Sequence, residues 1–159
     1  MNQIKRINIP DGHPGTRVTL RIMAALSREA KQSQSFCEFV KEMTCTVKTP
    51  DEMDSYMRAR FRYVPEDIET LYAPRMNVQH YREFGYFIGD CDDITMMYCA
   101  IFYALGYPSR MLAMRTNPND PNFTHVVPEL FINQAWRRFD PTVEVDVRHV
   151  FYGAMHEYV

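Results

Sequence analysis

The spacing of apolar residues predicts that the first third of the chain is helical. From Thr16 to about Met43, apolar side chains recur mostly every three or four residues, which indicates one amphipathic helix or two helices broken near Ser33–Ser35. Pro50 opens a further helix, and the two acids that follow it suit the positive end of the helix dipole. Residues 1–15 contain too many prolines and glycines for a regular element, so we expect an extended arm there.

A nearly all-apolar helix is predicted in the middle of the chain. Gly89-Asp90 supplies a breaker and a cap, an almost continuous apolar run extends from Cys91 to Leu105, and Gly106 ends it. A helix that is apolar on all sides belongs in the centre of a fold. The preceding stretch, Tyr63–Gly89, predicts an irregular connector with a short helix around Val78–Phe84.

After Pro108 the apolar pattern changes to a period of two, which is typical of strands. The candidate strands are Arg110–Arg115, Thr124–Ile132 and Trp136–Asp140. Helices followed by antiparallel strands predict an α+β domain. We expect residues 1–57 to form an arm and helices packed on a core formed by residues 58–159.

Composition narrows the possible partners. The 159 residues carry 18 Lys and Arg against 20 Asp and Glu, so no overall basic field supports nucleic-acid binding. No apolar run reaches the roughly 18 residues of a membrane span, and the N-terminus lacks the apolar region of a secretory signal, so we expect a cytoplasmic protein without a membrane partner. The cysteines and histidines lack metal-ligand spacing, and neither a metal nor a cofactor is expected. His149 and His156 in the tail are expected on the surface.

Cys91 is the candidate nucleophile, because it stands in the first turn of the predicted central helix. Free backbone N–H groups and the helix dipole favour a thiolate there and would lower the pKa of Cys91, whereas the neighbouring Asp92 and Asp93 oppose this. These acids and Asp90 could suggest a calcium site, but helix capping explains them better. We expect the other three cysteines to be inert core residues: Cys37, Cys45 and Cys99.

His125 and Asp140 are candidate partners of that nucleophile. If Asn133-Gln134 is a two-residue hairpin loop, Asp140 lies opposite Val127, and His125 points to the same face of the sheet. Diagonal neighbours of this kind are close enough for an imidazole to meet a carboxylate. A bulge at Pro128 would shift this register.

Five short motifs follow one another between Arg58 and Val143: Phe61-Arg62-Tyr63-Val64-Pro65, Gly89-Asp90-Cys91-Asp92-Asp93, Ala104-Leu105-Gly106-Tyr107-Pro108-Ser109-Arg110, Thr124-His125-Val126 and Phe139-Asp140-Pro141-Thr142. In this order they resemble the transglutaminase-like superfamily, and more closely its small bacterial and prophage-encoded members. The resemblance implies a papain-like core in which a cysteine begins a central helix packed on an antiparallel sheet. It places the catalytic cysteine, histidine and aspartate at Cys91, His125 and Asp140.

The expected activity is thiol-dependent acyl transfer. Cys91 would form a thioester with a peptide or protein substrate. Water would then hydrolyse this thioester, and the protein would be a cysteine peptidase or amidase. Alternatives are transfer to an amine (a transglutaminase), acyl transfer from an acyl-CoA to an arylamine, and a non-catalytic phage-associated assembly or binding module. Acyl transfer also needs hydrogen-bond donors for the negatively charged oxygen of the intermediate, and the second of these donors is not assigned. The backbone N–H of Cys91 is one candidate donor, and Gln79 or Tyr86 could supply a side chain.

Overall fold

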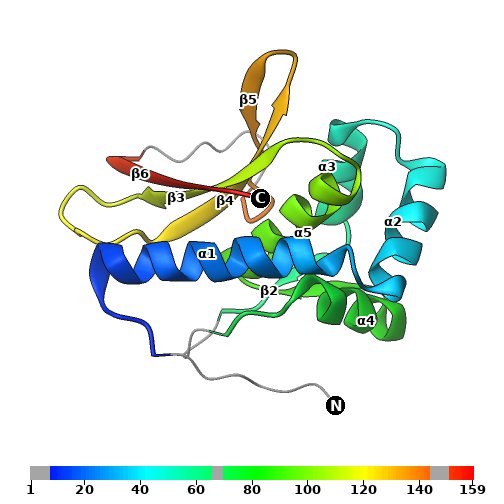
Figure 1. The fold of residues 1–159 in the computed structure, drawn as a ribbon, viewed down its shortest axis with the longest axis horizontal. Coiled ribbons are helices and arrows are strands. Elements are labelled where there is room, and N and C mark those ends of the chain that lie inside the picture. Colours follow the sequence, from blue (N-terminus) through cyan, green and yellow to red (C-terminus); the bar gives the residue numbers. More distant parts are fainter. Residues whose placement is uncertain (1–7, 66–69, 144–150) are drawn as a thin grey trace.

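The computed structural model describes residues 8–65, 70–143 and 151–159. Helix α5 lies in the middle of the molecule, between a four-stranded sheet and the other helices (Figure 1). The helices are α1 (Gly12–Ala30), α2 (Gln34–Thr46), α3 (Pro50–Arg58), α4 (Pro74–Phe84) and α5 (Cys91–Ala104). The strands are β1 (Phe61–Tyr63), β2 (Phe87–Gly89), β3 (Ser109–Arg115), β4 (His125–Ile132), β5 (Ala135–Arg138) and β6 (Gly153–Tyr158). This arrangement confirms the predicted α+β class.

Of the two alternatives for residues 16–43, one helix or two, the structure has two helices. Helix α1 ends at Ala30, and Ser33 caps α2 by accepting a hydrogen bond from the backbone N–H of Phe36 at 3.5 Å. The start of α1 differs from the prediction, because the helix already begins at Gly12 and runs through Pro14-Gly15. A proline is tolerated in the first turn of a helix, where its missing N–H is not needed.

Two short strands replace part of the predicted irregular connector. β1 and β2 pair in parallel, with Tyr63 opposite Gly89. Between them, α4 begins four residues earlier than expected. The buried Asn77 of α4 holds β2 from the other side: Ile88 N–H donates to its Oδ1 at 3.0 Å, and its Nδ2 donates to the Ile88 carbonyl at 2.7 Å. These contacts place the segment that leads into α5.

The main sheet has the strand order β5-β4-β3-β6, and all its neighbouring strands are antiparallel. Asn133 and Gln134, with φ of 51° and 63°, form the predicted two-residue turn between β4 and β5. Pro128 causes no bulge: β4 pairs continuously with β3, and the N–H of Phe139 donates to the carbonyl of Pro128 at 3.0 Å. The edge strand β6, in the tail, was not predicted.

The core surrounds α5, as the apolar sequence of this helix predicts. Residues 93–102 are all buried. Four methionines of α5 and β3 are fully buried and fill this core with flexible side chains: Met96, Met97, Met111 and Met114. Helix α1 packs against α5, where Ser27 Oγ donates to the carbonyl of Met96 at 3.2 Å. Among the described residues, we find no helix with the length and apolar content that crossing a membrane requires.

Candidate active site

Cys91 is the first residue of α5, and the acids around it fix that position. Asp90 accepts a hydrogen bond from Asp92 N–H at 2.9 Å, and Asp93 returns the contact by accepting from Asp90 N–H at 3.3 Å. This capping box confirms the capping expected for Asp90 and Asp93. It also uses backbone N–H groups that the sequence analysis assigned to a thiolate.

Gly89 is required at the entrance to this turn. Its φ is +132°, a conformation that side chains rarely adopt, and a Cβ there would lie 2.1 Å from Oδ2 of Asp93. Asp93 is fully buried and also accepts from the N–H of Tyr72 at 2.7 Å. The segment before Cys91 is therefore rigidly held from both sides.

His125 and Asp140 meet as the hairpin register predicts. His125 is the first residue of β4, Asp140 lies two residues after β5, and their Nε2 and Oδ2 atoms are 2.9 Å apart. Each side chain is 12% exposed. Thr142 supports the carboxylate, because its hydroxyl donates to Oδ1 of Asp140 at 2.7 Å.

Arg58, at the end of α3, holds the chain at Asp140, a contact the sequence analysis missed. Its Nη2 donates to the carbonyl of Asp140 at 2.7 Å, and its Nη1 donates to the carbonyl of Val143. Asp54 orients Arg58 through an ion pair of 2.7 Å. The contact between Arg58 and Asp140 joins residues that are 82 positions apart in the sequence, and no local pattern indicates it.

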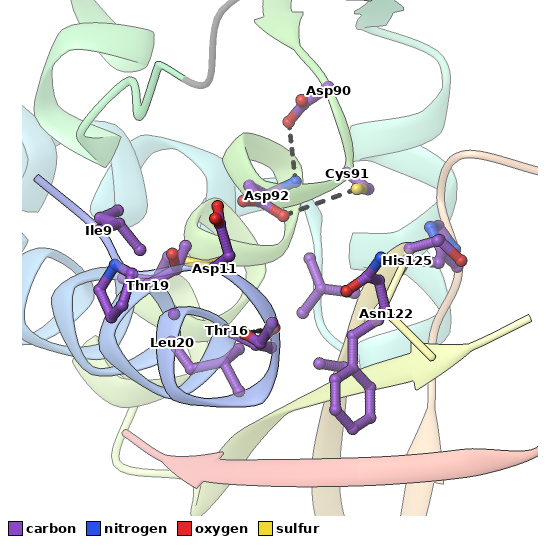
Figure 2. Close-up of a pocket in the computed structure, with 18 of the residues that line it drawn as sticks. Ile9, Asp11, Thr16, Thr19, Leu20, Asp90, Cys91, Asp92, Asn122 and His125 are labelled. Atoms are coloured by element: carbon purple, nitrogen blue, oxygen red, sulfur yellow. Dashed lines mark hydrogen bonds between the residues drawn. The ribbon is translucent and has the colours of Figure 1, made fainter. Parts of the chain in front are cut away.

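Cys91 and His125 line one cleft of about 490 Å³. Figure 2 shows Cys91 and His125 on one side of this cleft, with Thr16 and Thr19 of α1 across from them. α5 and β4 come together at Val126: its carbonyl accepts from Thr95 Oγ1 at 3.2 Å, and its N–H lowers the pKa of the Cys91 thiol through a hydrogen bond. Asp140 lies behind His125, outside the cleft lining.

Overall, the pKa of Cys91 is raised, so the lowering expected from the helix terminus is outweighed, and the opposing effect expected of Asp92 is present. Partial burial of the thiol is the largest cause of the raised pKa, and the negative charge of Asp92 is the next. Sγ donates to Oδ1 of Asp92 at 3.6 Å, as the dashed line in Figure 2 shows. The resting group is therefore a neutral thiol that needs a base.

The other cysteines differ in exposure. Cys99 is fully buried, as expected. Cys37 and Cys45 are exposed, so their assignment to the core is wrong. The buried face of α2 is formed instead by its larger apolar side chains: Phe36, Phe39, Val40 and Met43.

One group of side chains in the described part of the chain has the spacing of metal ligands. It consists of Asp90, Cys91 and Asp92, whose potential ligand atoms all lie within 4.8 Å of one another. Asp90 acts as the helix cap and Asp92 accepts from the thiol, so both carboxylates have roles in the fold and the site without an ion. We assign no metal to them.

Several residues that line the cleft were not identified from the sequence, and two that were suggested do not line it. Nine of the nineteen lining residues precede residue 24, and Tyr63 also contributes. Gln79 is exposed on α4 and Tyr86 packs under Arg62; neither faces the cleft. His156 is half-exposed on β6, 3.7 Å from Glu129, and His149 lies outside the described residues.

Most of the chain matches a known protein family. The family model described as the transglutaminase-like superfamily matches residues 33–141, more than half of the chain. The chain belongs to the transglutaminase-like superfamily. The superfamily match includes Cys91, His125 and Asp140, and it begins after α1. Membership places the protein in a family of thiol-dependent enzymes.

A solved structure of low sequence identity shares this fold. A candidate cysteine protease from Cytophaga hutchinsonii superposes with a TM-score of 0.56 at 16% identity, over 77% of this chain and 42% of that one. A candidate protease from Parabacteroides distasonis gives a TM-score of 0.44 at 15% identity, over 77% and 26% of the two chains. This chain thus covers less than half of either protein. No curated protein matches the sequence significantly.

Proposed function

We propose that the protein is a cysteine peptidase or amidase in which Cys91, His125 and Asp140 form a catalytic triad. The observation that carries the proposal is the 2.9 Å contact between Nε2 of His125 and Asp140, beside a cysteine that lines the same cleft as His125. This arrangement has a nucleophile, a base and a carboxylate that orients the base.

The mechanism begins with a proton transfer, because the thiol is neutral at rest. Nε2 of His125 is engaged with Asp140, so the proton of Cys91 passes to Nδ1. The sulfur then attacks the carbonyl carbon of the substrate, and the carbonyl π electrons move to oxygen. Asp140 stabilises the imidazolium that results.

Collapse of this intermediate releases the product. The electron pair on oxygen re-forms the carbonyl, the C–N bond breaks, and the leaving amine takes the proton from Nδ1 of His125, which leaves a thioester on Cys91. Water then attacks the thioester while His125 accepts its proton, and the thiol is regenerated with a carboxylic acid product. Water is the acceptor in this proposal because it is the solvent at the cleft, and an amine would have to be positioned there to compete with it.

The test uses casein in the presence of excess fluorescent cadaverine. We expect new amino termini to appear without incorporation of the amine, and both signals to be absent for Cys91→Ala. Cys37→Ser, which removes an exposed thiol remote from the cleft, serves as the matched control and should retain activity.

The same test distinguishes the alternatives. Stoichiometric, Cys91-dependent incorporation of cadaverine would make the protein a transglutaminase. Absence of both products, together with a Cys91 that iodoacetamide does not label, would indicate a binding or assembly module.

A further inference from the structure

The proposed reaction places a negative oxygen beside two carboxylates. Asp90 and Asp92 flank Cys91 and line the same cleft. Their negative charges disfavour the oxyanion that forms on the substrate oxygen when the sulfur attacks, just as the charge of Asp92 disfavours the thiolate. A hydrogen-bond donor aimed at the oxyanion would offset this repulsion, and such donors contribute strongly to acyl transfer.

Tyr63 is fixed next to the nucleophile by the short parallel pair of strands. It stands opposite Gly89 in the β1–β2 pair, and the N–H of the following Val64 donates to the carbonyl of Gly89 at 2.8 Å. Gly89 is two residues before Cys91, so this pairing ties Tyr63 to the start of α5. The tyrosine lines the cleft together with Cys91 and His125.

The Tyr63 hydroxyl is a donor at neutral pH. Burial is the largest cause that raises the pKa of Tyr63, and negative charge on Cys91 (when it is a thiolate), Asp90 and Asp92 raises it further, so the phenol keeps its proton. All three of these residues line the cleft together with Tyr63. Tyr63 is nevertheless 54% exposed, which leaves it accessible to a substrate entering the cleft.

We propose that Tyr63 is a further catalytic residue, whose hydroxyl donates a hydrogen bond to the oxyanion formed when Cys91 attacks the substrate carbonyl. This inference rests on the proposed function. The S–C bond forms, the carbonyl π electrons move to oxygen, and the thiol proton is held by His125. The Tyr63 hydroxyl keeps its own proton and only donates a hydrogen bond, which it loses when the carbonyl re-forms.

Two reactions of the same thiol separate this role from a structural one. Acylation by p-nitrophenyl acetate passes through a tetrahedral oxyanion, whereas alkylation by iodoacetamide does not. Both rates can be measured in a Cys37→Ser, Cys45→Ser background, which removes the exposed thiols. Tyr63→Phe should slow acylation by roughly 100-fold, the order of magnitude for one lost oxyanion donor, and change alkylation by less than about two-fold.

Tyr86→Phe is the matched control, because it removes a phenol hydroxyl near β2 that does not line the cleft. It should leave both rates unchanged. Thermal unfolding followed by circular dichroism checks that each variant is folded.

Other results for the two rates would contradict either the role of Tyr63 or the proposed function. Equal acylation by wild type and Tyr63→Phe removes Tyr63 from the reaction while the proposed function stands. A parallel fall in both rates would mean that Tyr63 acts on the thiol and not on the oxyanion. A wild-type protein that is alkylated at Cys91 but never acylated contradicts the proposed function itself, and the role of Tyr63 falls with it.

Discussion

The carboxylate of Asp140 is held in its charged form by its neighbours. Burial alone would raise its pKa, but hydrogen bonds from His125 and Thr142 outweigh this and lower it. Because the pKa in the folded state lies below the unfolded value, these bonds stabilise the fold above the ordinary pKa of an aspartate. That stabilisation is lost as the pH falls through the lowered value. At neutral pH, Asp140 therefore remains available to balance an imidazolium.

Asp140→Asn should retain the fold and lose activity. An amide can donate a hydrogen bond to Nε2 and hold the imidazole in the wrong tautomer, and it cannot stabilise the charged ring. The expected fall in turnover is on the order of 10⁴-fold. The measurement is casein hydrolysis by protein whose circular dichroism matches wild type. Undiminished turnover would exclude Asp140 from the mechanism.

Asp92 keeps Cys91 in its uncharged form, whereas the neighbours of Asp140 keep that carboxylate charged. Its carboxylate accepts from Sγ and raises the pKa of the thiol. Asp92→Asn removes a negative charge, which favours the thiolate, so the curve of alkylation rate against pH should move to lower pH by about 1 unit. Iodoacetamide rates between pH 6 and 10 measure this shift.

A control for this shift is Glu83→Gln, which removes an exposed charge from α4 outside the cleft and should leave the curve in place. If Asp92→Asn moved the curve upward or not at all, the carboxylate would not control the thiol.

At the scale of elements, local patterns predicted the structure wherever partners are close in sequence. The Asn133-Gln134 turn fixes the register that brings His125 to Asp140, and all of this lies within 16 consecutive residues. The strands β1 and β2 were missed because three residues carry no measurable period and their pairing joins Tyr63 to Gly89 across α4. Tertiary pairing, not local preference, creates such strands.

The hairpin turn offers a stability test of that element. Gln134 has a φ of 63°, which costs a residue with a side chain about 1–2 kcal/mol and costs glycine little. After allowing for the greater freedom of glycine in the unfolded chain, Gln134→Gly should stabilise the protein by about 0.5–1 kcal/mol. Urea unfolding measures the change.

The same substitution in a helix should have the opposite effect. Gln79→Gly, on the exposed face of α4, should cost about 1 kcal/mol. A destabilised Gln134→Gly protein would show that the turn does not limit stability as its backbone angles indicate.

At the scale of the whole molecule, the cleft joins parts of the chain that no local pattern connects. Thr16 and Thr19 come from α1, while Cys91 and His125 come from α5 and β4 (Figure 2). The apolar faces of the N-terminal helices predict that they pack on the core, but no local pattern indicates that α1 lies across the cleft from Cys91. That depends on how the completed helices and sheet are assembled.

Filling this side of the cleft should exclude large substrates only. Thr16→Trp places a large side chain in the cleft, so casein hydrolysis should fall at least about ten-fold while alkylation by iodoacetamide stays near the wild-type rate. Arg17→Trp, on the adjacent exposed position outside the cleft, is the control and should leave both unchanged. Equal casein hydrolysis by all three proteins would show that substrates do not pass along α1.

Helix α1 lies outside the superfamily match, although it forms one wall of the cleft. The proposed triad lies within residues 33–141, whereas much of the opposing wall of the cleft comes from residues that precede this range. Under the proposed function, selectivity and reactivity would be carried by separate stretches of one chain. Exchanging the leading helix would give enzymes that react with the same small thiol reagents and yet process different proteins.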